Sequence, residues 1–293
     1  MIRFCLLMIA FFLISTLSAQ QEEVEHRALN LTIKDYGISI GNSARTNGLR
    51  INFRDKQLEK VNGVNVTLWY PKDGENPDAV INGMAIGLIH THAHSINGMS
   101  LSSGFSGNNF NGMHIAILGG GVENNITGFG FGGLGIGGGG NMKGVVVGGL
   151  GAGFAGNVTG IGIGGLGIGC GENIKGIGIG GIGIGCGENI TGIGIGGFGV
   201  GCGGDIKGIG IGGIGVGAGN SINGLALSAG MVKTPVFKGV AFASYVNVNE
   251  FRGLSIAIFN RAKELKGVQL GVVNYAGNNP KLLRLLPLVN MNF

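Results

Sequence analysis

The sequence is poor in charge and in proline, and it contains no cluster of basic residues. Charged residues make up 12% of the 293 residues, five residues are Pro, and the formal net charge is +5. Because nucleic-acid-binding proteins gather Lys and Arg on one patch, the scattered basic residues here predict no nucleic-acid partner. Although 65 residues are Gly, a hydrophobic content of 44% argues against disorder. The glycines do not recur at every third residue, which excludes a collagen helix.

The sequence also lacks the residue sets on which enzymes depend. No Ser, His and acid combination stands out, and no Cys and His combination does, so we predict no enzymatic activity and no cofactor. A dinucleotide-binding fingerprint, Gly-x-Gly-x-x-Gly, begins at Gly178. That fingerprint needs a following helix whose N-terminus holds the pyrophosphate, and the alternating sequence here predicts no helix. We therefore attribute the match to the repeat and predict no nucleotide binding.

Residues 1–19 have the pattern of a secretory signal peptide. Arg3 supplies a positive charge, residues 4–14 are almost wholly apolar, and small residues lead to a cleavage site near Ala19. No Cys stands directly after the apolar run, and no later segment has the composition of a membrane-spanning helix. We predict export to the cell surface, the outer membrane or the periplasm of a Gram-negative bacterium.

An internal repeat is the dominant signal. A block of an apolar residue, a variable residue and Gly recurs at a constant interval from Gly112 to Gly224. Outside that range the interval is one or two positions shorter, with one longer step from Gly63 to Gly83. The glycines of these blocks, called the anchor glycines below, are Gly48, Gly63, Gly83, Gly98, Gly112, Gly128, Gly144, Gly160, Gly176, Gly192, Gly208, Gly224, Gly239, Gly253 and Gly267. A fixed period of this length is typical of solenoid proteins.

Each repeat predicts two short strands joined by two corners. Ile177 and Ile179 alternate with Gly, and after a Gly-Gly pair the alternation continues in a shifted phase with Ile182 and Ile184. Period-two alternation is typical of strands, and the phase shift indicates a bend. Because one repeat cannot bury its own apolar face, we predict an all-β, parallel β-solenoid of about 15 coils. Each coil has about 14–16 residues and two short strands.

The apolar columns are expected to face inward and the glycines outward. In the outer repeats, polar residues such as Arg50 and Asn65 occupy the positions of the central glycines, which suggests that this column meets solvent. The expected core residues of one coil are Ile177, Ile179, Ile182 and Ile184. A patch of the expected outer wall consists of Gly178, Gly180, Gly194 and Gly196. Because Gly in a strand often marks the close approach of another backbone, this wall is a candidate face for self-association or for a cell-envelope component.

A polar column marks one corner of the repeat. Asn or Asp stands three positions before successive anchor glycines, at Asn125, Asn141, Asn157, Asn173, Asn189 and Asp205. Asn suits turns because its side chain bonds nearby backbone groups and tolerates positive φ. Stacked one repeat apart, these amides are also placed to hydrogen-bond one another along the rod.

Two further sets of residues are candidates for chemistry. His90, His92 and His94 share the outer face of one strand and could bind zinc, but a fourth ligand and supporting residues are lacking, so a solvated polar edge is favoured. Cys170, Cys186 and Cys202 fall in one column, with neighbouring Cα atoms at about 4.8 Å, within reach of a disulfide. The favoured alternative for them is a small apolar column that faces inward.

The end of the chain carries a specific resemblance. Residues 267–274 read GVQLGVVN, and residues 285–293 read LLPLVNMNF. With these segments the chain resembles a family of bacterial surface repeat-containing proteins, which have a signal peptide, repeats of the same length as those here and a similar terminal strand. The resemblance implies a location and an architecture but no activity. The chain then divides into a signal peptide (1–19), an N-terminal cap (20–44), the glycine-rich solenoid (45–277) and a C-terminal capping strand (278–293).

Together these observations predict a non-catalytic exported protein with a structural or interaction role at the cell surface or outer membrane. An outer-membrane β-barrel is one alternative, since the final Phe293 is typical of such barrels. Barrel strands need about 9–11 residues, however, which is longer than the five-residue strands expected here. A second alternative is a binding or adhesion protein that uses a flat face.

Overall fold

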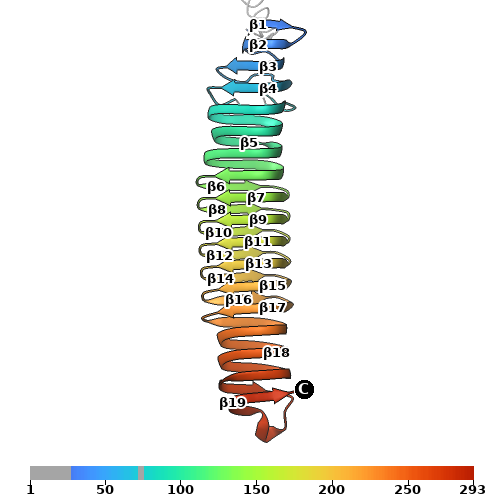
Figure 1. The fold of residues 1–293 in the computed structure, drawn as a ribbon, viewed down its shortest axis with the longest axis vertical. Helices are drawn as coiled ribbons and strands as arrows, with labels where there is room; N and C mark the ends of the chain where they lie inside the picture. Colours follow the sequence, from blue (N-terminus) through green and yellow to red (C-terminus); the bar gives the residue numbers. More distant parts are fainter. Residues whose placement is uncertain (1–27, 72–75) are drawn as a thin grey trace, which may run out of the picture.

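The chain forms a single rod of stacked coils. The computed structural model describes residues 28–71 and 76–293, which contain strands, one short 3₁₀ turn and no α-helix. The coils follow one another along one axis, with β1 at one end and β19 at the other (Figure 1). The strands of each coil pair in parallel with the strands of the next coil, and the sheet does not close on itself. This confirms the predicted parallel β-solenoid and shows that the barrel alternative was wrong.

The predicted signal peptide, residues 1–19, lies outside the described residues. Within the described part of the chain, no helix is long and apolar enough to span a membrane.

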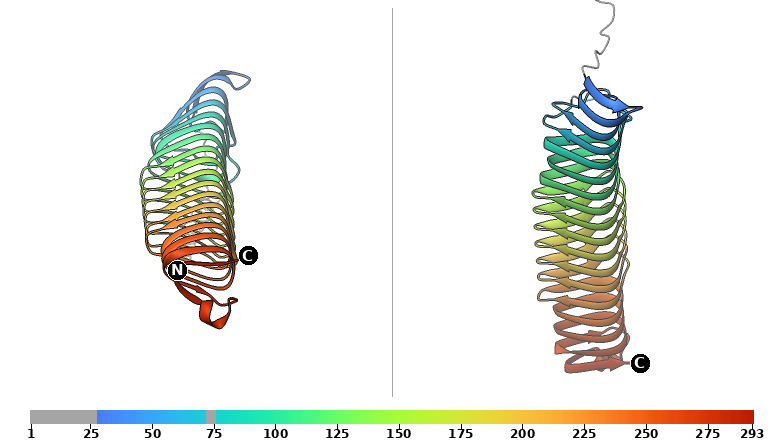
Figure 2. Two further views of the ribbon diagram at one scale, coloured as in Figure 1. Left: turned by 60° about the horizontal axis from the view of Figure 1, so that its bottom comes forward. Right: turned by 45° about the horizontal axis from the view of Figure 1, so that its top comes forward.

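Each coil is flattened, and two strand-bearing sides meet at tight corners (Figure 2).

The strands follow the repeat closely in the middle of the rod. They are β1 (Ala28–Ile33), β2 (Tyr36–Gly41), β3 (Arg45–Asn52), β4 (Lys60–Thr67), β5 (Val80–Gly132), β6 (Gly135–Gly138), β7 (Met142–Gly148), β8 (Gly151–Phe154), β9 (Val158–Gly164), β10 (Gly167–Cys170), β11 (Ile174–Gly180), β12 (Gly183–Cys186), β13 (Ile190–Gly196), β14 (Gly199–Cys202), β15 (Asp205–Gly212), β16 (Gly215–Ala218), β17 (Ser221–Ser228), β18 (Met231–Ala276) and β19 (Leu285–Asn292), with the 3₁₀ turn η1 (Lys281–Leu283) before β19. β5 and β18 wind through several coils without a break. Between them, each coil has one long strand on what we call the broad side and one short strand on the narrow side.

The orientation of the long strands is the reverse of the one predicted. Gly178 and Gly180 are buried, whereas Ile177 and Ile179 are partly exposed. The same holds one coil later, where the buried glycines are Gly194 and Gly196. The broad side therefore turns its glycines inward, and the prediction that these four glycines form an outer wall was wrong. The prediction that Ile177 and Ile179 form the core was wrong for the same reason.

The glycines face inward because side chains from the narrow side occupy the space next to them. A Cβ added to Gly178 would lie 3.2 Å from Cδ1 of Ile184, and one added to Gly194 would lie 3.0 Å from Cγ1 of Val200. Ile184 is thus a core residue, 5% exposed, as predicted. Ile182, also predicted to be buried, lies at a corner and is 47% exposed.

The polar residues that suggested an outward column lie inside the N-terminal coils. Arg50 is fully buried and forms an ion pair with Asp55. It also donates hydrogen bonds to Oδ1 of Asn65 at 2.8 Å and to the carbonyl oxygen of Ser43 at 3.0 Å. Asp55 in turn accepts a 2.8 Å hydrogen bond from the hydroxyl of Thr67. The N-terminal coils therefore have a polar interior, unlike the apolar interior of the middle.

The C-terminal end is closed in a similar way. β19 runs antiparallel to the last turn of β18, and the tail places Asn290 inside the rod. Asn290 accepts a 2.7 Å hydrogen bond from Nδ2 of Asn279 and donates one of 3.2 Å to the carbonyl oxygen of Asn274. At the other end, β1 pairs antiparallel with β2. Both ends of the sheet thus finish in an antiparallel strand, over or beside a hydrogen-bonded interior.

We expect Gly180→Ala to destabilise the rod and Gly185→Ala not to. A Cβ at position 180 would lie 2.8 Å from the carbonyl carbon of Gly183 and closer still to its oxygen, so backbone must move, at a cost of about 1–3 kcal/mol. A Cβ at position 185 meets nothing within 4 Å, and the change should be neutral or stabilise by about 0.5–1 kcal/mol. Urea or thermal unfolding of the two variants measures the difference. Equal stabilities would contradict the inward orientation of Gly180.

We expect Asp55→Asn to destabilise the N-terminal coils strongly. The change leaves the buried Arg50 without its counter-ion, which costs about 3–5 kcal/mol. The matched control is Glu59→Gln, which breaks the exposed pair between Arg45 and Glu59 and should cost about 1 kcal/mol or less. Hydrogen exchange of residues 45–67 reports the local loss. Similar exchange rates in both variants would show that the buried pair is not important for these coils.

Candidate interaction surfaces

The broad side presents an apolar surface to solvent. The residues one and three positions after every anchor glycine are apolar, and none of them is buried. The first column consists of Leu49, Val64, Met84, Met99, Met113, Phe129, Val145, Ile161, Ile177, Ile193, Ile209, Leu225, Val240, Leu254 and Val268. The second consists of Ile51, Val66, Ile86, Leu101, Ile115, Phe131, Val147, Ile163, Ile179, Ile195, Ile211, Leu227, Phe242, Ile256 and Leu270. We call these two columns together the apolar stripe.

The stripe is continuous from coil to coil. The parallel register places Ile177 beside Ile193 and Ile179 beside Ile195. It extends over both ends, where Ile38 of β2 lies beside Leu49. At the opposite end, β19 adds two more apolar side chains in register with the stripe. The adjoining corner adds further exposed apolar residues, 47–65% exposed, at Leu134, Leu150, Leu166, Ile182, Phe198 and Ile214.

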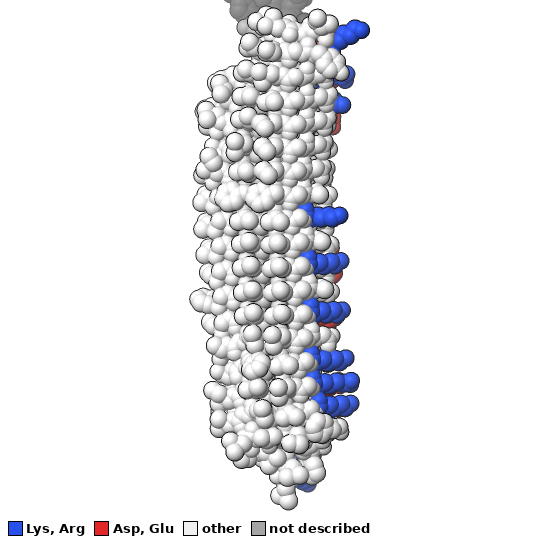
Figure 3. Space-filling model, viewed as in Figure 1, with Lys and Arg blue, Asp and Glu red and all other residues white. Residues whose placement is uncertain are grey.

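The other edge of the stripe is a charged corner. Six basic residues stand directly before an anchor glycine: Lys143, Lys175, Lys207, Lys238, Arg252 and Lys266. They follow one another along one edge of the rod, beside a broad face without charged side chains (Figure 3). Six acidic residues lie on the same corner, at Glu123, Glu172, Glu188, Asp205, Glu250 and Glu264. Nζ of Lys207 lies 3.5 Å from Asp205, and Arg252 pairs with Glu250, so this edge carries charges of both signs.

The corner amides form the predicted ladder. Nδ2 of Asn157 lies 3.1 Å from Oδ1 of Asn141, and the next two steps, through Asn173 to Asn189, measure 3.0 and 2.9 Å. The backbone amide of Asp205 continues the ladder to Asn189 at 2.8 Å. Asn125 belongs to the same column, and its Oδ1 accepts a 3.3 Å hydrogen bond from Nδ2 of Asn141.

A second amide ladder escaped the sequence analysis. It runs through the N-terminal coils in steps of 2.6, 2.8, 2.9 and 2.9 Å, joining Asn47, Asn62, Asn82, Asn97 and Asn111. Each of these residues directly precedes an anchor glycine, so the recurring Asn-Gly pair was the available signal. The two ladders together fix one corner of the rod over most of its length.

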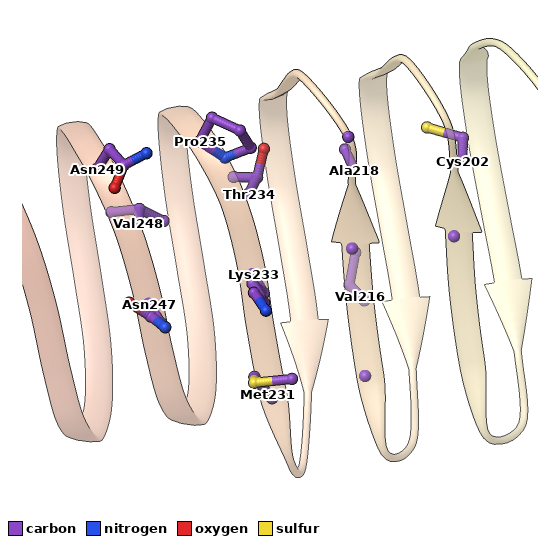
Figure 4. A pocket seen from close by; sticks show the side chains of 14 residues that line it. Cys202, Val216, Ala218, Met231, Lys233, Thr234, Pro235, Asn247, Val248 and Asn249 are labelled. Atoms are coloured by element: carbon purple, nitrogen blue, oxygen red, sulfur yellow. The ribbon is translucent and has the colours of Figure 1, made fainter.

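A bare glycine wall does exist, but on the narrow side. There the outward positions of the central coils are Gly, and a Cβ at Gly153 or Gly185 would meet nothing within 4 Å. The wall ends where Gly215 and Gly217 give way to Met231 and Lys233 in the next coil. A groove of about 570 Å³ lies at this step (Figure 4). Its lining includes Cys202, Val216, Met231, Lys233 and Asn247.

The three cysteines stack in register beside this wall. Cys170 faces Cys186, and Cys186 faces Cys202, on successive short strands. All three are free thiols of intermediate exposure that pack against the core. Hydrogen bonding along the column lowers the pKa of Cys170 and raises that of Cys186 to about 11. The pKa of Cys202 is raised as well, first by its hydrogen bond to Cys186.

The histidines fall into two environments. His90 and His92 point outward, and each lies 2.8 Å from the same hydroxyl, that of Ser106. His94 is partly exposed on the same strand. Burial, and then the charge of His92, lowers the pKa of His90 to about 4. No group of three or more His, Cys, Asp or Glu side chains in residues 28–71 and 76–293 is placed to hold a metal ion.

His114 lies inside the rod, two positions after an anchor glycine. It is fully buried, its ring packs against those of Phe105 and Phe110, and Nδ1 lies 2.9 Å from the hydroxyl of Ser100. Burial lowers its pKa to about 4, against a smaller opposing effect of a backbone hydrogen bond with Asn111. The alternating sequence around His114 does not by itself show that this side chain faces inward.

We expect His114 to make the rod less stable in acid. Between pH 6.5 and pH 4 the unfolded chain binds a proton at this site and the folded chain does not, so stability falls as the pH drops through this window. The loss is at most about 1.4 kcal/mol per pH unit. His114→Phe should flatten the dependence of Tm on pH between 6.5 and 4.5, whereas His94→Phe, at a partly exposed position, should not. An unchanged slope in His114→Phe would contradict the assignment.

Comparisons with known proteins identify no relative. No protein family, no curated protein and no solved structure matches this chain. The functional interpretation therefore depends on the geometry of the two sides of the rod.

Proposed function

We propose that this chain is a non-catalytic, exported repeat protein that acts by binding, at the cell surface or outer membrane, through its apolar stripe. The observation that supports this is the exposure of apolar side chains in two unbroken columns along the rod. With a rise of about 4.8 Å per coil, the 15 anchor-bearing coils extend the stripe over about 70 Å. At a width of about 12 Å, set by two columns about 7 Å apart, its area is on the order of 800 Å².

A surface of this size is unusual for a protein that works alone. The largest apolar patch on a typical soluble monomer measures about 300–600 Å² and is itself often functional. Leaving about 800 Å² of apolar surface in water, at about 25 cal/mol per Å², forgoes about 20 kcal/mol of stabilisation. A partner that covers the stripe gains a large part of that free energy, less the cost of association.

The fold itself does not require these residues to be apolar. In the same long strands, the outward position before the anchor glycine is polar, as at Lys175 and Thr191. The strand therefore accommodates polar side chains on its outer face. Since the next two outward positions are apolar in every coil, their character is better explained by a partner than by strand propensity.

The location rests on the chain ends. The predicted signal peptide supports export, and the resemblance of residues 267–274 and 285–293 to bacterial surface repeat-containing proteins supports a place at the envelope. The flat glycine wall of the narrow side is a second candidate surface, but it offers a partner only backbone and a shallow groove.

Cell fractionation with charged variants tests the proposal. Ile163→Lys with Ile195→Lys places two ammonium groups on the stripe, two coils apart. The matched control, Gly169→Lys with Gly201→Lys, places the same charges on the narrow side, where an added Cβ meets nothing nearer than 3.8 Å. We expect the wild type and the control to stay in the envelope fraction until detergent is added. At least a tenfold larger share of the stripe variant should be released into the soluble fraction.

Two results would contradict the proposal. One is identical fractionation of the two variants, which would remove the stripe from the function. The other is wild-type protein that remains in the cytoplasm with its predicted signal peptide intact. Thermal melts of both variants verify that the fold survives.

A further inference from the structure

We propose that the partner covering the apolar stripe is a second copy of this chain, packed face to face. This inference rests on the proposed function, because it names the occupant of the same surface. The two broad sides would form a sheet-on-sheet sandwich with the two stripes as its dry interior.

Matched spacing favours a second copy over an unrelated partner. From Gly112 to Gly224 the repeats are all of the same length, and each contributes one pair of apolar side chains to the stripe. Two stripes therefore have the same rise of about 4.8 Å per coil, and packed sheets lie about 10 Å apart. Aligning one coil of each copy aligns all the others, which lets the two rows of Ile and Val side chains interdigitate as in a steric zipper.

The area is sufficient for a stable pair. Two stripes of about 800 Å² bury about 1,600 Å² in total, which is the size of a standard stable protein interface. The exposed corner residues, such as Leu166 and Phe198, lie at the margin of the stripe and would add to this area. The interface is thus large enough without any contribution from the caps.

The composition of the stripe argues against a lipid surface. Its aromatic residues are Phe129, Phe131 and Phe242, and it contains no Trp or Tyr, the residues typical of membrane interfaces. Its charged edge carries basic and acidic side chains side by side, such as Lys207 with Asp205 and Arg252 with Glu250, whereas proteins that lie on membranes have an excess of basic residues at that place. Branched aliphatic residues on a flat sheet are instead typical of the interior between two packed sheets.

The arrangement limits association to two copies. The stripe occupies one side of the rod, so a face-to-face pair related by a two-fold axis covers both stripes completely. The run of parallel coils stops at an antiparallel strand at each end, β1 and β19, so a copy added end to end would not continue the parallel stack. A closed dimer, rather than a filament, is therefore the expected product.

Sedimentation of the purified chain, from Gln20 onward, tests the inference in detergent-free buffer between 1 and 50 μM. We expect a dimer for the wild type and for the control Gly169→Lys with Gly201→Lys. In Ile163→Lys with Ile195→Lys the same charge lies on both copies, so neither copy can neutralise the other. We expect the Kd to rise at least a hundredfold and the rod to melt as before.

Two outcomes would overturn the inference. The first is a wild type that stays monomeric at 50 μM, and the second is a dimer that the stripe variant does not weaken. In either case, flotation with vesicles of phosphatidylglycerol and phosphatidylethanolamine shows whether the stripe binds lipid instead. Binding that depends on the stripe would assign it to lipid and leave the proposed function standing. If fractionation in cells is also independent of the stripe, the proposed function fails together with the inference.

Discussion

The short distance between the two sides of the rod is the constraint on which the rest of the structure depends. Side chains such as Ile168 and Ile184 of the narrow side occupy the space that a side chain on the broad side would need, so the facing positions are Gly. Only one side of each coil can therefore supply the bulk of the core. The larger share of the apolar residues of the long strand then points to solvent, and a solvent-facing apolar surface follows from a thin interior.

The interior of the rod differs in polarity between its two ends and its middle. In the middle, the interior is apolar and similar from coil to coil, with Ile174, Ile190 and Ile206 buried in register. At the ends, the interior contains hydrogen-bonded groups with fixed geometry, around Arg50 in the first coils and Asn290 in the last. Because polar groups in an interior must find specific partners, they define where the array starts and stops. The repeat thus sets the cross-section, and the two polar interiors set the length.

The sequence predicted the coil and the corner ladder, but it misplaced the two faces of the long strand. Period and phase shift are local properties, so the solenoid and the stacking of Asn141 on Asn125 followed from spacing alone. Orientation depends on what lies opposite, and strict alternation of Ile and Gly fits either choice. The polar residues Arg50 and Asn65 then favoured the wrong orientation. In a sequence, polar residues that are buried around an ion pair cannot be distinguished from polar residues that face solvent.

Constant repeat length has a consequence for how such a chain can change over time. Gain or loss of one whole repeat leaves the cross-section and both ends unaltered, because each repeat contacts only its neighbours. Such an event lengthens or shortens the exposed surface by about 4.8 Å, or roughly 60 Å². In a pair of identical copies both surfaces change, so the covered area changes by about 120 Å², which at about 25 cal/mol per Å² sets an upper bound of about 3 kcal/mol. Gain or loss of repeats would therefore change the strength of the proposed association in steps, without any new type of residue.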